Sequence, residues 1–237
     1  MSTRAVTPAA VLFDLDGTLI DTEPVWMAAE QALAAEFGGT WTAEQAASCI
    51  GYSIPDTAGR LRAEAGVDLP VPEIVDRLLG VVAAVVREDL PWQPGARELL
   101  AQLGQHRVPC ALVTMSYRVL AEAVLAALPP STFETVVTGD QVARGKPDPL
   151  PYLTAAKTLG VDPQDCVVIE DSPAGIASGR AAGAAVVAVP HLAGLPDRAD
   201  VTVVASLAEV DLHLLAELVS AASRRGRAPE REVSSPL

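Results

Sequence analysis

Asp14 and Asp16 stand one residue apart where the apolar run of VLFDLDGTLID (residues 11–21) ends, and Gly17, which lets a chain turn sharply, follows. Charge at the end of a buried strand costs free energy unless a cation or hydrogen bonds offset it. Two interpretations of this stretch are open. It can be a turn, because Asp, Gly and Thr all favour turns, or it can be a catalytic or metal-binding site.

Polar side chains also follow the other apolar runs that have the character of strands. In a doubly wound parallel sheet, ligands bind outside the carboxyl ends of the strands, so neighbouring strands would bring these side chains to one edge. Each has a plainer role when taken alone: Ser116 could cap the following helix, and Lys146 could be a solvated loop lysine. The set comprises Thr114, Ser116, Asp140, Lys146, Glu170 and Asp171.

Together, these residue types support phosphoryl transfer. Asp14 can act as a nucleophile that forms an aspartyl-phosphate, and Asp16 can protonate the leaving oxygen and later activate water. Mg²⁺ prefers oxygen ligands, and carboxylates at Asp14 and Asp171 would supply two of them. Mg²⁺, Lys146 and the Thr114 hydroxyl would neutralise the phosphoryl oxygens.

The elements that must position these residues change character along the chain. Residues 24–37, 42–49, 55–65 and 72–89 have helical spacing with no strand among them. From residue 94 onward, short β-branched runs alternate with helices, which indicates a parallel sheet covered on both faces. The expected strands are 9–15, 108–114, 135–139, 166–171, 184–189 and 201–204, and the helices between and after them are 95–104, 117–128, 149–159, 173–182 and 207–221.

This alternation predicts an α/β fold: a doubly wound parallel sheet, as a Rossmann-like core, with an inserted α-helical cap domain. The core would comprise residues 1–21 and 92–222, and the cap residues 22–91. The charged, Pro-containing segment 223–237 is expected to be a disordered tail.

Composition excludes several functional classes. A net charge of −13 and a pI of 4.6 argue against nucleic acid and anionic membranes as partners. A small anionic substrate stays possible, because a local cation can reverse the field in a pocket. Cys49, Cys110 and Cys166 show no CxxC spacing, and no apolar run is long enough for a secretion signal or a membrane span. We expect a cytoplasmic monomer whose partner is a small phosphorylated metabolite.

Four ordered motifs resemble those of the haloacid dehalogenase-like superfamily, in its phosphatase and β-phosphoglucomutase branch with an α-helical cap. They are VLFDLDGT at 11–18, LVTMS at 112–116, GKPDP at 145–149 and VVIEDSPAG at 167–175. With the alternating pattern, the resemblance covers residues 9–190. It implies a Mg²⁺-dependent phosphatase that hydrolyses a small phosphomonoester, a sugar or polyol phosphate, through an aspartyl-phosphate.

The resemblance also implies roles for the matched residues. Mg²⁺ would be held by Asp14, the backbone carbonyl of Asp16 and Asp171, with Glu170 as a ligand or as a partner behind the ligands. The substrate phosphate would be held by Thr114, the Met115 amide and Lys146. Substrate specificity would lie in the cap, and the candidates there are Trp26, Gly51, Tyr52 and Ser53. Packing in the cap core is an equally open role for Trp26 and Tyr52.

Departures from the family pattern discriminate between activities. Dehalogenases that attack carbon lack the acid at the position of Asp16, so this residue argues against that reaction. β-Phosphoglucomutases carry a His where this chain has Trp26 and an Arg where it has Ile54, so hydrolysis is favoured over the mutase alternative. A binding module that has kept the fold is a third possibility, but every position that the chemistry requires is filled.

Overall fold

Six parallel strands form one sheet in the part of the chain that the computed structural model describes, residues 7–50, 52–190 and 200–226. The strand order is β3-β2-β1-β4-β5-β6, so β1 lies in the middle of the sheet, between β2 and β4. The strands are β1 Ala10–Phe13, β2 Cys110–Val113, β3 Thr135–Val137, β4 Cys166–Glu170, β5 Ala185–Ala188 and β6 Thr202–Val203.

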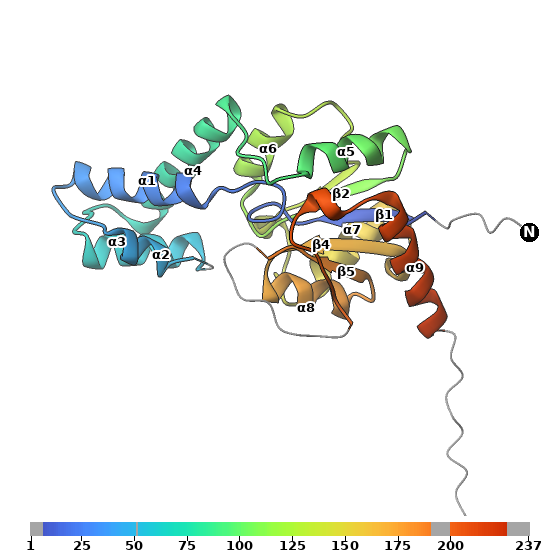
Figure 1. Ribbon diagram of the computed structural model, residues 1–237. Helices are drawn as coiled ribbons and strands as arrows, with labels where there is room; N and C mark the ends of the chain where they lie inside the picture. Colours follow the sequence, from blue (N-terminus) through green and yellow to red (C-terminus); the bar gives the residue numbers. More distant parts are fainter. Residues whose placement is uncertain (1–6, 51, 191–199, 227–237) are drawn as a thin grey trace, which may run out of the picture.

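Helices cover both faces of this sheet (Figure 1). On one face Phe13 of β1 belongs to a hydrophobic cluster with residues of α5, α6 and α9, and on the other Leu12 packs with residues of α7 and α8. Burial on both faces explains why the strands read as continuous apolar runs. The predicted doubly wound α/β sheet is confirmed. These helices are α5 Ala96–Gln105, α6 Arg118–Ala126, α7 Leu150–Leu159, α8 Pro173–Ala181 and α9 Leu212–Gly226.

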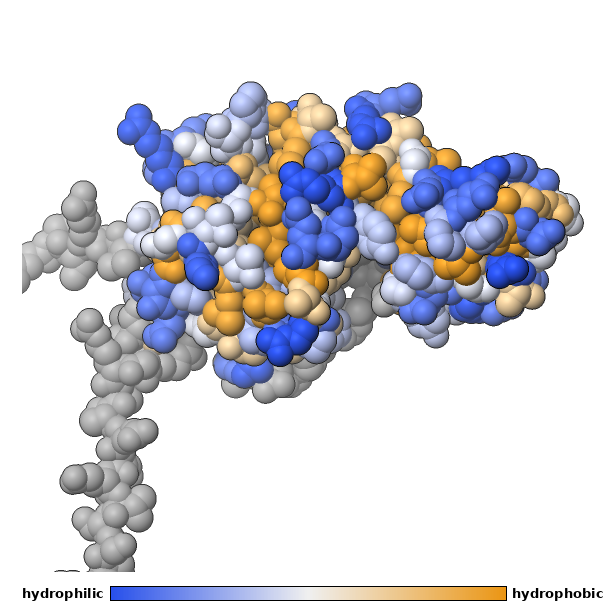
Figure 2. Space-filling model, turned by 180° about the vertical axis from the view of Figure 1, so that it is seen from behind, coloured by the Kyte–Doolittle hydropathy of each residue, from blue (hydrophilic) through white to orange (hydrophobic). Residues whose placement is uncertain are grey.

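A helical unit lies between β1 and α5 in the chain and to one side of the sheet in space (Figure 1), which confirms the inserted cap. Its long helix α4 buries Ile74, Leu78, Val82 and Val86, whose spacing of four residues forms one apolar face. The same helix packs against α6 of the core. The cap helices are α1 Glu23–Glu36, α2 Ala43–Ala47, α3 Ile54–Glu64 and α4 Val71–Glu88. Seen from behind, the cap shows apolar surface among hydrophilic side chains (Figure 2).

The two connections between cap and core run side by side. The Asp21 amide donates to the Pro91 carbonyl at 2.8 Å, and the Gln93 amide donates to the Leu19 carbonyl at 2.9 Å. The Gln93 side chain also donates to the Gly17 carbonyl at 3.1 Å. The outgoing and returning chains are therefore held together next to the turn that follows Asp14 and Asp16.

The C-terminal part of the chain differs from the expected single helix over 207–221. A short 3-10 helix, η3, spans Leu207–Glu209, and α9 begins only at Leu212. Two capping side chains explain the break: Ser206 accepts from the Ala208 amide, and Asp211 accepts from the Leu214 amide. Helix α9 then continues to Gly226, past the expected start of the tail at residue 223, and residues 227–237 lie outside the described residues.

The strand expected over 135–139 ends at Val137, because Gly139–Gln141 form a 3-10 helix, η1. A third such turn, η2, spans Pro163–Asp165 before β4. Among the described residues, no helix combines the length and the apolar character needed to cross a bilayer.

Candidate active site

The central position of β1 decides where the predicted site residues lie. Because β2 and β4 flank β1 in parallel, the carboxyl ends of the three strands meet at one edge of the sheet. Asp14 follows β1, Thr114 follows β2, and Glu170 is the last residue of β4. The structure therefore brings these three side chains to one place from distant parts of the sequence.

Lys146 links the three strand ends. Its ammonium group donates to Asp14 Oδ1 at 2.6 Å, to Glu170 Oε1 at 2.6 Å and to the Val113 carbonyl at 2.9 Å. The side chain is only 4% exposed, so the alternative of a solvated loop lysine is wrong. Although burial lowers the pKa of Lys146, Asp14 and Glu170 raise it above its ordinary value, and the group is cationic.

Glu170 is fully buried and anchors Lys146 to the start of α8. Its Oε2 accepts from the Asp171 amide at 3.2 Å and from the amide and hydroxyl of Ser172 at 3.1 and 3.0 Å. Gly175 makes room for this carboxylate, because a Cβ at that position would overlap it. A carboxylate at a helix N-terminus is also favoured by the unpaired amides and the helix dipole there.

Asp14, Glu170 and Asp171 place carboxylate oxygens within 4.8 Å of one another. Burial raises the pKa of Asp14, and burial followed by the charge of Glu170 raises the pKa of Asp171 to about 7. Lys146 is the one cation among the described residues that contacts this cluster, so three carboxylates share a single positive charge. Oxygen ligands with uncompensated negative charge fit a hard divalent cation such as Mg²⁺.

Asp16 lies apart from this cluster and is oriented by hydroxyl groups. Its Oδ1 accepts from Thr22 at 2.6 Å, and its Oδ2 accepts from Ser116 at 2.5 Å and from Thr114 at 3.4 Å. Ser116 does not cap α6, since the N-cap residue is Tyr117 and no side chain caps that helix. The interpretation of Ser116 as the N-cap residue of α6 is therefore wrong, and its hydroxyl instead positions Asp16.

Gly17 is required by two features of the turn after β1. Its φ of +85° lies in the left-handed region, and a Cβ there would collide with the carboxylate of Asp171. The neighbouring Thr18 hydroxyl donates to Asp171 Oδ1 at 3.4 Å. The stretch after β1 is thus a turn, as one interpretation predicted. The turn also brings the stretch against Asp171, so it is compatible with the other interpretation, a catalytic or metal-binding site.

The residues after β2 and β3 differ in what they offer to a ligand. The Thr114 hydroxyl accepts from the Ser116 amide at 2.9 Å, and the Met115 sulfur accepts from the Lys146 amide at 3.3 Å. Asp140 accepts from the Thr138 hydroxyl at 2.6 Å and from the Arg118 amide at 3.3 Å. Asp140 therefore stabilises the start of α6 rather than the carboxylate cluster.

The cap candidates have distinct surroundings. Trp26 is half-buried and packs against the hydrophobic core, whereas Tyr52 is 56% exposed. The Ser53 hydroxyl is engaged as the N-cap of α3: it accepts from the Asp56 amide at 3.2 Å and donates to Asp56 Oδ2 at 2.6 Å. Gly51 lies outside the described residues.

Tyr152, which no sequence signal indicated, completes the surroundings of Glu170. The tyrosine is fully buried, its hydroxyl donates to Glu170 Oε1 at 2.8 Å, and Lys146 Nζ lies 5.1 Å from the centre of its ring. Burial and the charge of Glu170 raise the pKa of Tyr152, so the hydroxyl remains a donor. Its position six residues after Lys146, within the apolar face of a helix, gave no sign of this contact.

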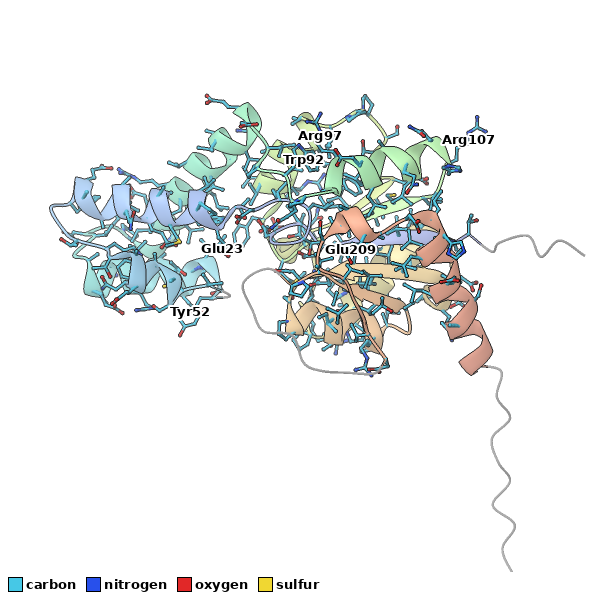
Figure 3. The ribbon with its side chains drawn as sticks, in the orientation of Figure 1. Glu23, Tyr52, Trp92, Arg97, Arg107 and Glu209 are labelled. Carbon is cyan, nitrogen blue, oxygen red and sulfur yellow. The ribbon has the colours of Figure 1, made fainter. Side chains whose placement is uncertain are left out.

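Glu23, at the start of α1, was also missed. Burial, followed by the charges of Asp16, Glu30 and Asp21, raises its pKa to about 7. Figure 3 shows its side chain at the N-terminal end of α1, on the side of the cap that faces the core. A lone Glu in the first turn of a helix is ordinary, so only the structure reveals the neighbouring acids.

Comparison with known proteins agrees with this geometry. Residues 11–189 match the family described as haloacid dehalogenase-like hydrolase. The chain is 37% identical to hexitol phosphatase A of Escherichia coli, over 78% of this chain and 84% of that protein. It is 34% identical to the bifunctional riboflavin kinase/FMN phosphatase of Arabidopsis thaliana over 78% of this chain, which spans about half (49%) of that protein.

Among solved structures, CbbY from Rhodobacter sphaeroides in complex with phosphate has a TM-score of 0.75 at 26% identity, covering 85% of this chain and 96% of that one. The family match and the relatives together define the class. The protein belongs to the haloacid dehalogenase-like hydrolases.

Proposed function

We propose that this protein is a Mg²⁺-dependent phosphatase that hydrolyses a small phosphomonoester, a sugar or polyol phosphate, through an aspartyl-phosphate on Asp14. One observation carries the proposal: three carboxylates, of which Asp14 and Glu170 are buried and Asp171 is half-buried, lie within 4.8 Å of one another at the carboxyl edge of the sheet with Lys146 as their one contacting cation among the described residues. Such a cluster is costly unless a further cation completes it, and that cation would also attract an anionic substrate.

The metal would be held by the carboxylates of Asp14 and Asp171 and by the backbone carbonyl of Asp16. Glu170 would mainly hold Lys146 rather than bind the metal itself, because its oxygens already accept from Lys146, Tyr152 and the start of α8. Bound Mg²⁺ would supply positive charge that offsets the phosphoryl oxygens as the new bond forms.

Asp14 and Asp16 have different roles in the two halves of the reaction. An oxygen of Asp14 attacks phosphorus, the bond from phosphorus to the ester oxygen breaks, and Asp16 gives its proton to that oxygen. In the second half, Asp16 takes a proton from a water molecule that attacks phosphorus, which releases inorganic phosphate and restores Asp14. Thr22 and Ser116 hold the Asp16 carboxyl in position for both transfers.

Lys146 and Thr114 would hold the phosphate, together with the Met115 amide. Lys146 is bound to Asp14 at 2.6 Å, so an oxygen of the phosphoryl group on Asp14 would lie near the ammonium group. A positive charge fixed in a buried site stabilises negative charge without reorganising during the reaction.

Residues 22–91 would form the cap that covers this site and selects the substrate. The names of the relatives favour phosphorylated carbohydrates as substrates, since one is a hexitol phosphatase. Two features disfavour the phosphosugar mutase: Trp26 packs into the hydrophobic core, and the apolar Ile54 begins α3. Phosphorylated metabolites are retained inside cells by their charge, which favours the cytoplasmic location expected from the sequence.

A panel of phosphorylated metabolites, assayed with Mg²⁺ for release of inorganic phosphate, tests the proposal. We expect phosphate release from one or more sugar or polyol phosphates, and loss of that release in excess EDTA. Isomerisation of a phosphosugar without phosphate release would favour the mutase. Binding without any turnover would favour a module that has kept only the fold.

A further inference from the structure

The carboxylate of Glu170 has every acceptor position occupied. Its Oε1 accepts from Lys146 Nζ at 2.6 Å and from the Tyr152 hydroxyl at 2.8 Å, and its Oε2 accepts from the Asp171 amide and from the amide and hydroxyl of Ser172. An ionised carboxylate offers about four lone-pair sites, so these donors leave none free. Because Glu170 is fully buried, bulk water does not replace a donor that is lost.

Tyr152 supplies its hydroxyl from a fixed ring. The residue lies in the first turn of α7, is fully buried, and packs in the hydrophobic cluster that contains Leu12 of β1 and Val113 of β2. Lys146 Nζ lies 5.1 Å from the centre of the same ring, so the ring face also attracts the ammonium group. The ring and the hydroxyl therefore make separate contacts, and Tyr152→Phe removes only the contact of the hydroxyl with Glu170.

The ammonium group of Lys146 is shared between two carboxylates at equal distances. It donates to Asp14 Oδ1 at 2.6 Å, to Glu170 Oε1 at 2.6 Å and to the Val113 carbonyl at 2.9 Å, which uses its three donors. Asp14 and Glu170 therefore compete for one cation. Since the Tyr152 hydroxyl donates to the same oxygen of Glu170, it weakens the hold of that oxygen on Lys146 and favours Asp14 in the competition.

We propose that Tyr152 is a positioning residue whose hydroxyl sets how the ammonium group of Lys146 is shared between Glu170 and Asp14. Without the hydroxyl, Glu170 Oε1 would draw the ammonium group away from Asp14. Negative charge on a phosphoryl group at Asp14 would then be stabilised less, because the cation no longer lies beside it. The effect on the reaction rests on the proposed phosphatase function, whereas the position of the ammonium group does not.

The chain offers a matched control for the tyrosine and a simple spectrum for the lysine. Tyr117, the N-cap residue of α6, is half-buried against the core, and its hydroxyl forms no hydrogen bond among the described residues, so Tyr117→Phe removes a hydroxyl outside the carboxylate cluster. Lys157 is exposed and is the chain's one other lysine. Protein labelled with a heavy nitrogen isotope in lysine therefore gives two side-chain ammonium signals, which Lys157→Met assigns.

Nuclear magnetic resonance of these ammonium groups, in EDTA and without substrate, tests the position of Lys146. In the wild-type background, Asp14→Asn replaces an anionic acceptor and should displace the Lys146 signal. In the Tyr152→Phe background, the same change should displace the signal by less than about half as much, because the ammonium group already lies closer to Glu170. In the Tyr117→Phe background, the displacement should equal that in the wild type.

Turnover tests the consequence for the reaction. For Tyr152→Phe we expect kcat on the best substrate of the metabolite panel to fall about tenfold, with KM within about threefold of the wild type, because the ammonium group acts on charge that develops during the reaction. Tyr117→Phe should leave both constants unchanged. Glu170→Gln removes the competing anion, so Tyr152→Phe in that background should lower kcat by less than about threefold. Thermal unfolding verifies that each variant is folded at the assay temperature.

Three outcomes would overturn the inference. They are an equal displacement of the Lys146 signal in the Tyr152→Phe and wild-type backgrounds, a kcat that Tyr152→Phe leaves unchanged, and a loss of kcat that is as large in the Glu170→Gln background. If Tyr152→Phe fails to fold, fluorotyrosine incorporated at all tyrosines replaces it. The fluorinated hydroxyl is a stronger donor and should enlarge the displacement caused by Asp14→Asn, and an unchanged displacement would overturn the inference. A wild type inactive on every ester contradicts the proposed function instead, and the resonance measurement then decides the role of Tyr152 alone.

Discussion

The proposed catalytic centre and a cluster in the cap are each built around one cation with several partners, but in opposite surroundings. In the cap cluster, Arg60 of α3 donates to Glu64 at 2.8 Å and to the Ser48 hydroxyl at 2.8 Å. Lys146 is 4% exposed and its partner Glu170 is fully buried. The side chain of Arg60 is 28% exposed and that of its partner Glu64 is 39% exposed. Removing Lys146 leaves carboxylates unpaired in the interior, whereas removing Arg60 leaves partners that water can solvate.

This difference indicates how tightly the two regions are constrained. The groups proposed to react lie in a largely buried network in which each side chain is held by its neighbours, so their geometry is set before a substrate arrives. The cluster around Arg60 is partly exposed, so water can solvate the partners that a substitution leaves behind. Variants in the two regions should therefore differ in kind as well as in size.

The largest effect is expected from Asp14→Asn. The amide keeps the shape of the side chain but removes the anionic nucleophile, so turnover should fall by about 10⁴-fold or more. Asp140→Asn, at the same edge of the sheet, is the matched control and should retain activity. Steady-state phosphate release measures both, and activity of Asp14→Asn within tenfold of the wild type would contradict the covalent mechanism.

Lys146→Met should lower turnover nearly as much as Asp14→Asn does, and it should also destabilise the protein. Loss of the ammonium group leaves Asp14 and Glu170 buried without a cation, which costs about 3–5 kcal/mol in the free energy of unfolding. The chain has only one other lysine, Lys157, so Lys157→Met is a natural control and should change stability little. Urea unfolding compares them; equal stability of the two variants would mean that Lys146 is not paired as described.

The metal-free protein should lose stability as pH rises. The folded pKa of Asp171 is raised from 3.8 to about 7, so the unfolded carboxyl ionises first and the folded state favours the proton. The contribution of Asp171 to stability should therefore be fully present below about pH 4, fall as pH rises to about 7, and level off above it, a loss of about 2 kcal/mol or more.

Asp171→Asn should flatten this slope, and Mg²⁺ should raise the Tm of the wild type more at pH 7.5 than at pH 5, because it binds the ionised carboxylates. Thermal unfolding at the two pH values, with Mg²⁺ and with EDTA, makes the measurement. A stability that rises over this pH range in EDTA would show that the carboxylate cluster is already compensated by other groups.

Glu23→Gln should also weaken the fall of stability with rising pH, but by less than Asp171→Asn does. The pKa of Glu23 is raised from 4.5 to about 7, chiefly by burial, but the group is partly exposed and water screens its neighbours. We expect the variant to gain about 1 kcal/mol above pH 7 and nothing at pH 4.5. Urea unfolding at both pH values checks this, with Glu36→Gln at the other end of α1 as the control.

Much of the fold could be predicted because the signals are local. Most strands of the core are short apolar runs, and the acidic residues at or directly after the ends of β1 and β4 form most of the proposed site. Gly17 was predicted to turn the chain sharply, and its positive φ confirms it. The helix expected over 207–221 was wrong because two capping residues, Ser206 and Asp211, outweighed a continuous apolar pattern.

The remaining features depend on contacts between residues far apart in sequence. Nothing near Tyr152 indicates that its hydroxyl meets Glu170, and the sequence alone does not connect Arg60 with Trp41 and Tyr52. The interpretation of Ser116 as a helix cap failed for the same reason, because its partner Asp16 lies on another strand end. Composition held one unused clue, since a chain with only two lysines places one of them in the site motif GKPDP.

Trapping the phosphoryl group on Asp14 tests the central claim most directly. The protein would be mixed with Mg²⁺ and a substrate found in the metabolite panel, quenched in acid within the first turnover, digested and examined by mass spectrometry. We predict one phosphoryl group on the peptide that contains Asp14, and none in Asp14→Asn. Phosphate release with this peptide unmodified throughout the first turnover, or with the group on Asp16, would contradict the account.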